Sequence, residues 1–145
     1  MENFLDYIPH RPPFLFIDRV VEHTGDSIVT EWLLKEAEPF FEGHFPNRPI
    51  TPGVIMCEFV FQSGAILMAV RDNNSGEDHT PVITRIQNVK LKNPAFPGYL
   101  LRAEVLLKEK TGGAAYMAGK ITSDSKKILT VDFAAMLLDN SQAKP

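Results

Sequence analysis

Residues 54–71, VIMCEFVFQSGAILMAVR, form the longest apolar stretch of the chain and decide its fold class. The stretch favours a helix, because it is longer than an ordinary β-strand. Its apolar side chains cover every face of that helix, which is typical of a helix buried on most sides. Glu58, Gln62 and Ser63 interrupt it, so it is too short and too polar for a membrane span of about 20 apolar residues. We therefore predict the core helix of a soluble protein.

The rest of the chain carries mainly strand signals. Runs rich in β-branched and other apolar residues are separated by turn residues and lie at 14–22, 27–35, 82–92, 99–110, 114–122 and 128–138. Short turns join the last four runs, which predicts an antiparallel meander. A curved antiparallel sheet would supply the apolar face that the helix needs, so we predict an α+β protein with a sheet wrapped around one long helix. This is the outline of a hot-dog fold, although the pattern alone also allows other α+β arrangements.

Composition narrows the class of protein. The 145 residues suit one domain, 1–145, and a hydrophobic share of 44% with 23% charged residues is typical of a globular protein. The net charge of −3 argues against nucleic-acid binding. Cys57 is the only cysteine, which excludes an intramolecular disulfide and disfavours a thiolate metal site. The N-terminal residues lack the pattern of a signal peptide, so we expect a cytoplasmic protein with no membrane association.

His44 lies in a long connection, 36–53, that precedes the helix. Loops of this length in compact domains are usually functional or disordered. Phenylalanines at positions 40, 41 and 45 predict that the connection packs against the core, and prolines at 46, 49 and 52 stiffen it. A stiff loop holds a side chain at fixed geometry, which makes His44 a candidate general base. The alternative is a hydrogen-bonded packing residue.

Glu58 is the only acidic residue of the predicted helix, and Gln62 follows it one turn later. Burial of an unpaired carboxylate is costly and raises its pKa. A carboxyl group with a raised pKa suits a general acid near neutral pH. The alternative is that Glu58 faces solvent or a subunit boundary, and that Gln62 merely shares its side of the helix.

The dipeptide Pro52–Gly53 opens the predicted helix, whose first N–H groups are unpaired and carry partial positive charge. A base, an acid and a helix N-terminus that can hold an oxyanion suit proton abstraction beside a carbonyl. A metal site is disfavoured, because no second histidine lies at ligand spacing from His44: His10 and His23 lie in turns, and His79 lies in a polar loop. Neither a G-x-S-x-G elbow nor a phosphate-binding glycine motif occurs.

Three segments resemble the FabZ-type 3-hydroxyacyl-[acyl-carrier-protein] dehydratases. They are HRPPFLFIDRV (10–20), GHFPNRPITPGVIMCE (43–58) with the FVFQ that follows, and KNPAFPGYLLRAEV (92–105). The family patterns HRYPFLLVDR and GHFPGxPxxPGVLxxEaxaQ occur in the same order and spacing. The resemblance extends from about Tyr7 to Leu138 and implies the hot-dog fold.

By this resemblance His44 is the catalytic base, Glu58 is the catalytic acid, the Gly53 N–H polarises the thioester carbonyl, and Gln62 orients the carboxyl of Glu58. The implied enzyme is a lyase that dehydrates (3R)-hydroxyacyl chains on acyl carrier protein to trans-2-enoyl chains, in fatty-acid or related acyl-chain biosynthesis. It needs no cofactor. Related FabA-type enzymes, which also isomerise their product, have Asp at the position of Glu58, so Glu favours the simple dehydratase.

The resemblance also implies partners. Two chains would pair so that the histidine and glutamate of one site come from different subunits, and three such homodimers would make a hexamer. Acyl carrier proteins are acidic, so we expect a salt-sensitive basic patch near the mouth of the substrate tunnel. Its candidate residues are Arg11, Arg48, Arg85, Lys90, Lys92 and Arg102.

Two other functions remain open. One is a hot-dog thioesterase, which would cleave the acyl thioester instead of dehydrating it. The other is a non-catalytic acyl-binding subunit, which is disfavoured because His44, Glu58 and Gly53 are all present.

Overall fold

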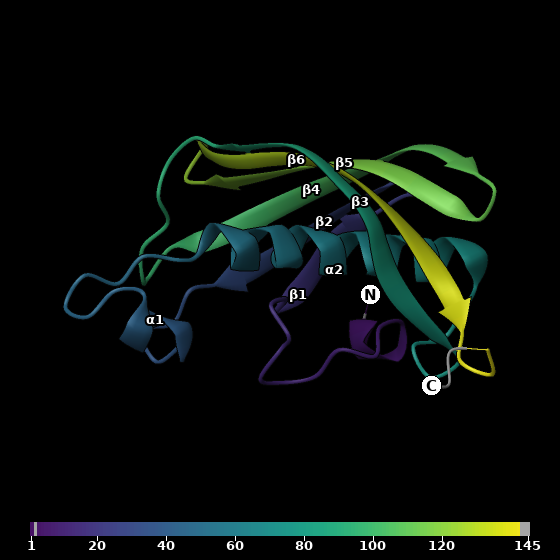
Figure 1. The fold of residues 1–145 in the computed structure, drawn as a ribbon, viewed down its shortest axis with the longest axis horizontal. Helices are drawn as coiled ribbons and strands as arrows, with labels where there is room; N and C mark the ends of the chain where they lie inside the picture. The colour runs from purple at the N-terminus through teal and green to yellow at the C-terminus, as the bar shows by residue number, and fades with distance from the viewer. Residues whose placement is uncertain (2, 143–145) are drawn as a thin grey trace.

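In the computed structural model, which describes residues 1 and 3–142, one antiparallel sheet curves around a long helix (Figure 1). That helix is α2 (Gly53–Asp72). The six strands are β1 (Arg19–His23), β2 (Ser27–Leu33), β3 (His79–Leu91), β4 (Leu100–Thr111), β5 (Ala114–Ser123) and β6 (Lys126–Asp139). Two short helical elements, η1 (Phe4–Asp6) and α1 (Phe40–Gly43), lie outside the sheet. The predicted α+β hot-dog architecture is confirmed.

The strand order of the sheet is β1-β2-β4-β5-β6-β3, with every neighbouring pair antiparallel. The predicted four-strand meander is therefore wrong in one part. β4, β5 and β6 form a meander, but β3 pairs with β6 at the edge and does not pair with β4. Residues 92–99 carry the chain across the sheet past the start of α2, where the Thr51 N–H donates to the Ala95 carbonyl at 2.9 Å. Turn residues show where a strand ends, but the choice of partner strand depends on how the sheet wraps the helix.

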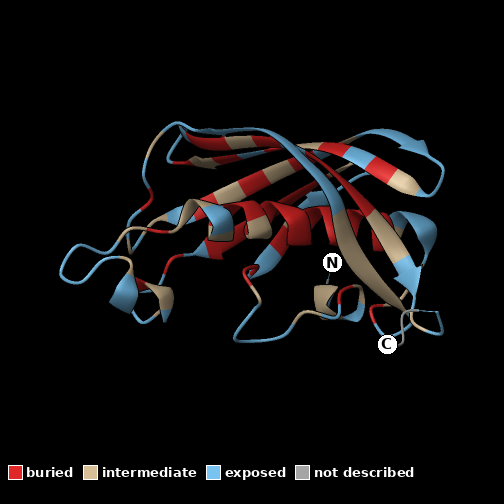
Figure 2. Cartoon of the chain, in the orientation of Figure 1, coloured by how far each residue is buried: buried red, intermediate tan, exposed pale blue. Residues whose placement is uncertain are grey.

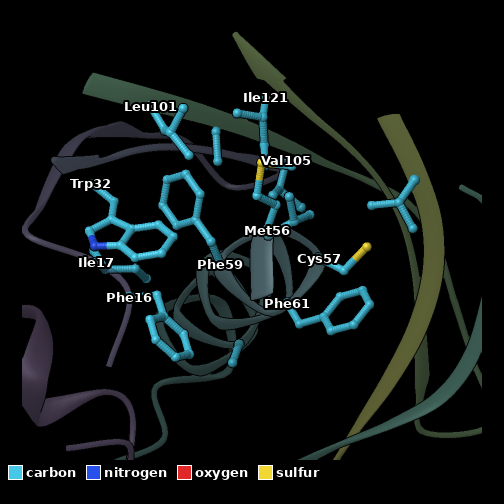
Figure 3. Close-up of a cluster of buried hydrophobic side chains, with 14 of the residues drawn as sticks. Phe16, Ile17, Trp32, Met56, Cys57, Phe59, Phe61, Leu101, Val105 and Ile121 are labelled. Carbon is cyan, nitrogen blue, oxygen red and sulfur yellow. The ribbon is translucent and has the colours of Figure 1, made fainter. Parts of the chain in front are cut away.

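Helix α2 is the centre of the core, and Figure 2 shows its buried residues against the inner face of the sheet. Around it, aromatic rings pack at close range. The centroids of Phe59 and Trp32, both labelled in Figure 3, are 5.6 Å apart. Those of Phe61 and Phe133 are 5.0 Å apart. Each buried side chain of this size stabilises the fold by about 1.5–3 kcal/mol. The expectation that the segment 54–71 is too short and too polar for a membrane span is wrong: by length and composition alone α2 could cross a membrane. Most of the helix is instead buried inside the protein, against the sheet. The exceptions are its two ends: Val54 in the first turn is 78% exposed, and Arg71 and Asp72 in the last turn are exposed.

The element boundaries differ from the prediction in two places before α2. The predicted strand 14–22 begins only at Arg19, because the Phe16 N–H donates to the Gln62 side chain of α2 and not to a neighbouring strand. The connection 36–53 contains α1 and buries Phe41, but Phe45 is 47% exposed, so the connection packs against the core only in part.

Candidate active site

The loop between α1 and α2 holds the ring of His44 in a fixed orientation. Its Nδ1 lies 2.8 Å from the Ile50 carbonyl oxygen. A carbonyl can only accept, so the ring proton lies on Nδ1 and Nε2 of the neutral ring is free to accept a proton. Backbone bonds tighten the same loop, because Phe45 and Arg48 bond to each other and the Ile50 N–H donates to the His44 carbonyl at 3.0 Å. The loop can therefore supply a fixed general base.

His44 and Gly53 line the same hollow, of about 310 Å³, which we call the His44 cavity. It lies between the loop, the first turn of α2 and the end of β3, where Leu91 closes one side. Pro52 precedes the helix and provides no side-chain acceptor, and the first helical N–H to find a backbone acceptor is that of Ile55. The Gly53 N–H therefore has no partner among the described residues. At the positive end of a long helix, this N–H suits a developing oxyanion.

Gln62 fixes the orientation of the Glu58 carboxyl. Its Nε2 donates to Glu58 Oε1 at 3.1 Å and to the Phe14 carbonyl at 3.2 Å, while its Oε1 accepts from the Phe16 N–H at 2.9 Å. The amide is fully buried, and these partners determine which end is oxygen and which is nitrogen. Gln62 therefore lies beside Glu58 and is bonded to its carboxyl, as its position one helical turn later predicts.

Glu58 has the electrostatic environment of a proton donor. Burial raises the pKa of its carboxyl above the ordinary value, and the hydrogen bond from Gln62 opposes this rise only in part. The group is still reachable, because its side chain retains 21% exposure. It lines a second hollow of about 110 Å³, the Glu58 cavity, together with His10, Phe61 and Ile83. A carboxyl in such surroundings can deliver a proton near neutral pH.

The structure brings the predicted site residues together in two pairs, not in one group. His44 and Gly53 share one cavity, Glu58 and Gln62 share the other, and the two cavities have no lining residue in common. Positions 53 and 58 are five residues apart on α2, so they face directions about 140° apart around the helix axis. Within one chain, His44 and Glu58 thus line separate cavities.

Sequence reasoning missed His10, whose Nε2 lies 3.6 Å from Glu58 Oε1. It also missed the backbone of Phe14 and Phe16 as partners of Gln62. The signal was present, since His10 opens the motif 10–20, but no spacing rule predicts contacts across more than forty residues. No group of three His, Cys, Asp or Glu side chains within the described part of the chain could hold a metal ion.

The fold defines a hot-dog protein, with the His44 cavity and the Glu58 cavity as its candidate sites. Among solved structures, the dehydratase heterocomplex ApeI:P from Xenorhabdus doucetiae matches with a TM-score of 0.81 at 15% identity, over 96% of this chain and 93% of that chain. The E. coli PaaI protein from the phenylacetic acid degradation operon matches with a TM-score of 0.64 at 11% identity, over 81% and 80% of the two chains. At these identities the likeness shows the fold alone.

Sequence comparison defines the family. Residues 8–132 match the FabA-like domain. The 3-hydroxyacyl-[acyl-carrier-protein] dehydratase FabZ of Nitratidesulfovibrio vulgaris (strain DP4) is 38% identical over 132 residues, which cover 86% of each chain. FabZ of Paramagnetospirillum magneticum (strain ATCC 700264 / AMB-1) is 33% identical over 140 residues, covering 96% of this chain and 87% of that one. The chain therefore belongs to the FabA-like family, in its FabZ-type branch.

Proposed function

We propose that the protein is a 3-hydroxyacyl-[acyl-carrier-protein] dehydratase, a cytoplasmic hydro-lyase that forms trans-2-enoyl chains in fatty-acid or related acyl-chain biosynthesis. Its membership of the FabZ-type branch supports this function. The structural observation that carries it is that the two cavities hold different chemical groups. A histidine with a free Nε2 lies beside an unpaired helix N–H in one, and a carboxyl whose pKa is raised by burial lies in the other.

The proposed mechanism uses each group once. The Gly53 N–H and the positive end of α2 bind the thioester carbonyl oxygen and make the Cα proton more acidic. His44 Nε2 takes that proton, and Glu58 gives its own proton to the hydroxyl at C3. The C3–O bond breaks, the C2–C3 double bond forms, and the hydroxyl leaves as water. Each acid–base group would contribute about 10²–10⁴-fold to the rate.

A complete site in this mechanism requires two chains. β3 is an edge strand: it pairs with β6 on one side, and no other described strand pairs with its outer edge. Its second half is exposed and carries three large apolar side chains, Ile86, Val89 and Leu91. An unpaired, partly apolar edge strand is a ready template for pairing with another chain.

The position of β3 explains how such pairing would complete the site. Leu91 borders the His44 cavity and Ile83 borders the Glu58 cavity, about 26 Å apart along an extended strand. If two β3 strands pair antiparallel about a two-fold axis near Gln87, Leu91 of one chain lies opposite the partner's Ile83. The His44 cavity of one chain then faces the Glu58 cavity of the other. We propose this homodimer, alone or as part of a hexamer, as the active unit.

The acyl carrier protein is the proposed partner, and the positions of two basic residues support a docking patch beside the His44 cavity. Lys92 lines the His44 cavity, and Arg48 lines the apolar hollow beside it. Arg102 is engaged with Glu31 at 3.4 Å, and Arg11 donates to three backbone carbonyls. We therefore propose that Arg48 and Lys92 form the centre of the docking patch, and that carrier affinity falls as salt rises.

The decisive experiment is a turnover assay on carrier-bound (3R)-hydroxyacyl chains with two readouts. Enoyl absorbance without release of free thiol supports the dehydratase. Thiol release, followed with a thiol-reactive dye, would instead identify a thioesterase. Acyl binding without either signal would overturn the enzymatic proposal and favour an acyl-binding subunit.

A further inference from the structure

The Glu58 cavity contains a histidine that the proposed mechanism does not use. His10 Nε2 lies 3.6 Å from Glu58 Oε1, on the same oxygen that accepts the hydrogen bond from Gln62. The carboxyl oxygen Oε1 thus faces two nitrogen atoms from different parts of the chain. His10 comes from the N-terminal loop and Gln62 comes from α2.

The N-terminal loop holds the His10 ring in place. The ring stacks on Phe14 with centroids 6.4 Å apart and planes 23° apart. The Phe14 carbonyl in turn accepts from Gln62, so the ring and the amide belong to one connected group. Arg11 braces the loop by donating to the His10 carbonyl at 2.7 Å. A side chain held in this way can orient its neighbour.

The surroundings of His10 also select its protonation state. Its Nδ1 is buried and has no hydrogen-bond partner among the described residues. A proton on Nδ1 would therefore be a buried, unpaired donor, whereas a proton on Nε2 faces Oε1 of Glu58. Burial and the nearby charge of Arg11 lower the pKa of His10, so the ring is neutral near neutral pH. The present distance is about 0.6 Å longer than an ordinary hydrogen bond, and catalytic contacts often tighten only when substrate binds.

We propose that His10 is a positioning residue for Glu58: its Nε2–H and the Gln62 amide both engage Oε1, so that Oε2 is the oxygen that carries the transferable proton. This inference rests on the proposed function, in which Glu58 is the acid. Before transfer, the two N–H groups fix the rotation of the carboxyl. After transfer, they stabilise the carboxylate that remains.

The other neighbours of Glu58 do not replace this contact. On α2, the titratable neighbour is Cys57, whose thiol pKa is raised by burial and by the charge of Glu58, so it stays neutral. In the N-terminal loop, the charged neighbour is Arg11, whose guanidinium donates to backbone carbonyls. From β3, the cavity receives Pro81 and Ile83, which carry no charge.

Three substitutions at position 10 test the proposal. Gln keeps an N–H donor at the position of Nε2, Asn has its amide nitrogen at the position of Nδ1, and Phe keeps the ring without a donor. We expect His10→Asn and His10→Phe to lower kcat about 10- to 100-fold with little change in KM. His10→Gln should retain most of the activity. Because loss of a neutral donor raises the pKa of Glu58, the pH optimum of kcat/KM should also move upward in the Asn and Phe variants.

The outcomes separate the inference from the function on which it rests. If His10→Asn and His10→Phe keep the wild-type kcat and pH optimum while Glu58→Gln is inactive, the positioning role is wrong and the dehydratase stands. Near-normal turnover by folded Glu58→Gln would overturn the assignment of the acid itself. A second test uses the wild-type protein, so it does not depend on whether a variant folds. It measures which ring nitrogen of His10 carries the proton. ¹⁵N NMR should show the proton on Nε2, and a proton on Nδ1 would overturn the proposal.

Discussion

The His44 cavity and the Glu58 cavity are built in opposite ways. His44 is oriented by Ile50, six residues away, and it shares its cavity with Gly53 at the start of the next helix. Glu58 is oriented by Gln62, which is itself held by backbone groups 46 and 48 residues away in the N-terminal loop. One half-site depends on a local loop, and the other depends on the tertiary fold. The base should therefore resist distant substitutions that misplace the acid.

The strongest test removes one reactive group from each cavity. We expect His44→Ala and Glu58→Gln each to lower kcat by about 10³-fold or more, because each loses a proton-transfer step. Circular dichroism and size-exclusion chromatography should show an unchanged fold and assembly. Near-normal turnover by either folded variant would contradict its assigned role.

Mixing these two inactive variants tests whether the cavities combine across chains. A heterodimer of His44→Ala and Glu58→Gln contains one site with both groups intact if the groups come from different subunits. Refolding or co-expressing the two together should therefore restore up to about half of the wild-type activity per heterodimer. A mixture that forms heterodimers and stays inactive would show that the site does not span two chains.

A substitution at Gln62 removes the hydrogen bonds that link Glu58 to the N-terminal loop. Gln62→Leu leaves the buried Phe16 N–H unpaired, which should lower the free energy of unfolding by about 1–3 kcal/mol, and it frees the Glu58 carboxyl to rotate. We expect kcat to fall about 10²-fold, since a small misplacement of a reacting group has effects of that size.

Ser63→Ala is the matched control for the Gln62 substitution. Ser63 lies on the same helix as Gln62, and the change removes its buried hydrogen bond of 2.7 Å to Thr30 of β2. It should cost about 1 kcal/mol of stability and leave kcat unchanged. If both variants lost activity in proportion to stability, Gln62 would have a structural role alone.

The protonation of Glu58 should appear in the pH dependence of stability. Because burial raises its pKa in the folded protein, the native state binds more protons than the unfolded state as pH rises above the ordinary value of 4.5. This group therefore destabilises the protein progressively from pH 4.5 toward neutrality. Glu58→Gln should raise the melting temperature more at pH 7 than at pH 4. An equal shift at both values would contradict the raised pKa.

The smallest effect is expected at Gly53, in the locally built cavity. A Cβ there would lie 2.9 Å from Leu91 Cδ1, a flexible side chain that can move. We expect Gly53→Ala to lower kcat/KM only about 2- to 5-fold, because the backbone N–H remains and only the cavity wall shifts. Adding Leu91→Ala should relieve the clash and recover part of the loss. A loss as large as that of His44→Ala would mean that position 53 tolerates no side chain.

Much of the fold and site could be predicted because its signals are local. The length and apolar pattern of 54–71 predicted α2, and the prolines and glycine before it predicted a stiff loop beside a helix N-terminus. The pairing of β3 with β6 could not be predicted in the same way, since the turn residues after β3 are compatible with a hairpin. The burial of Gln62 under the N-terminal loop had no sequence signal at all.

The sequence by itself determined a buried helix, an antiparallel sheet around it, and the three chemical groups His44, Gly53 and Glu58. Those features follow from side-chain patterns within one element or one loop. The tertiary structure decided that β3 lies at the edge, that His44 and Glu58 line separate cavities, and that His10 lies beside Glu58. These features depend on how the sheet and the N-terminal loop close around α2, because contacts between distant segments form only where their buried surfaces fit.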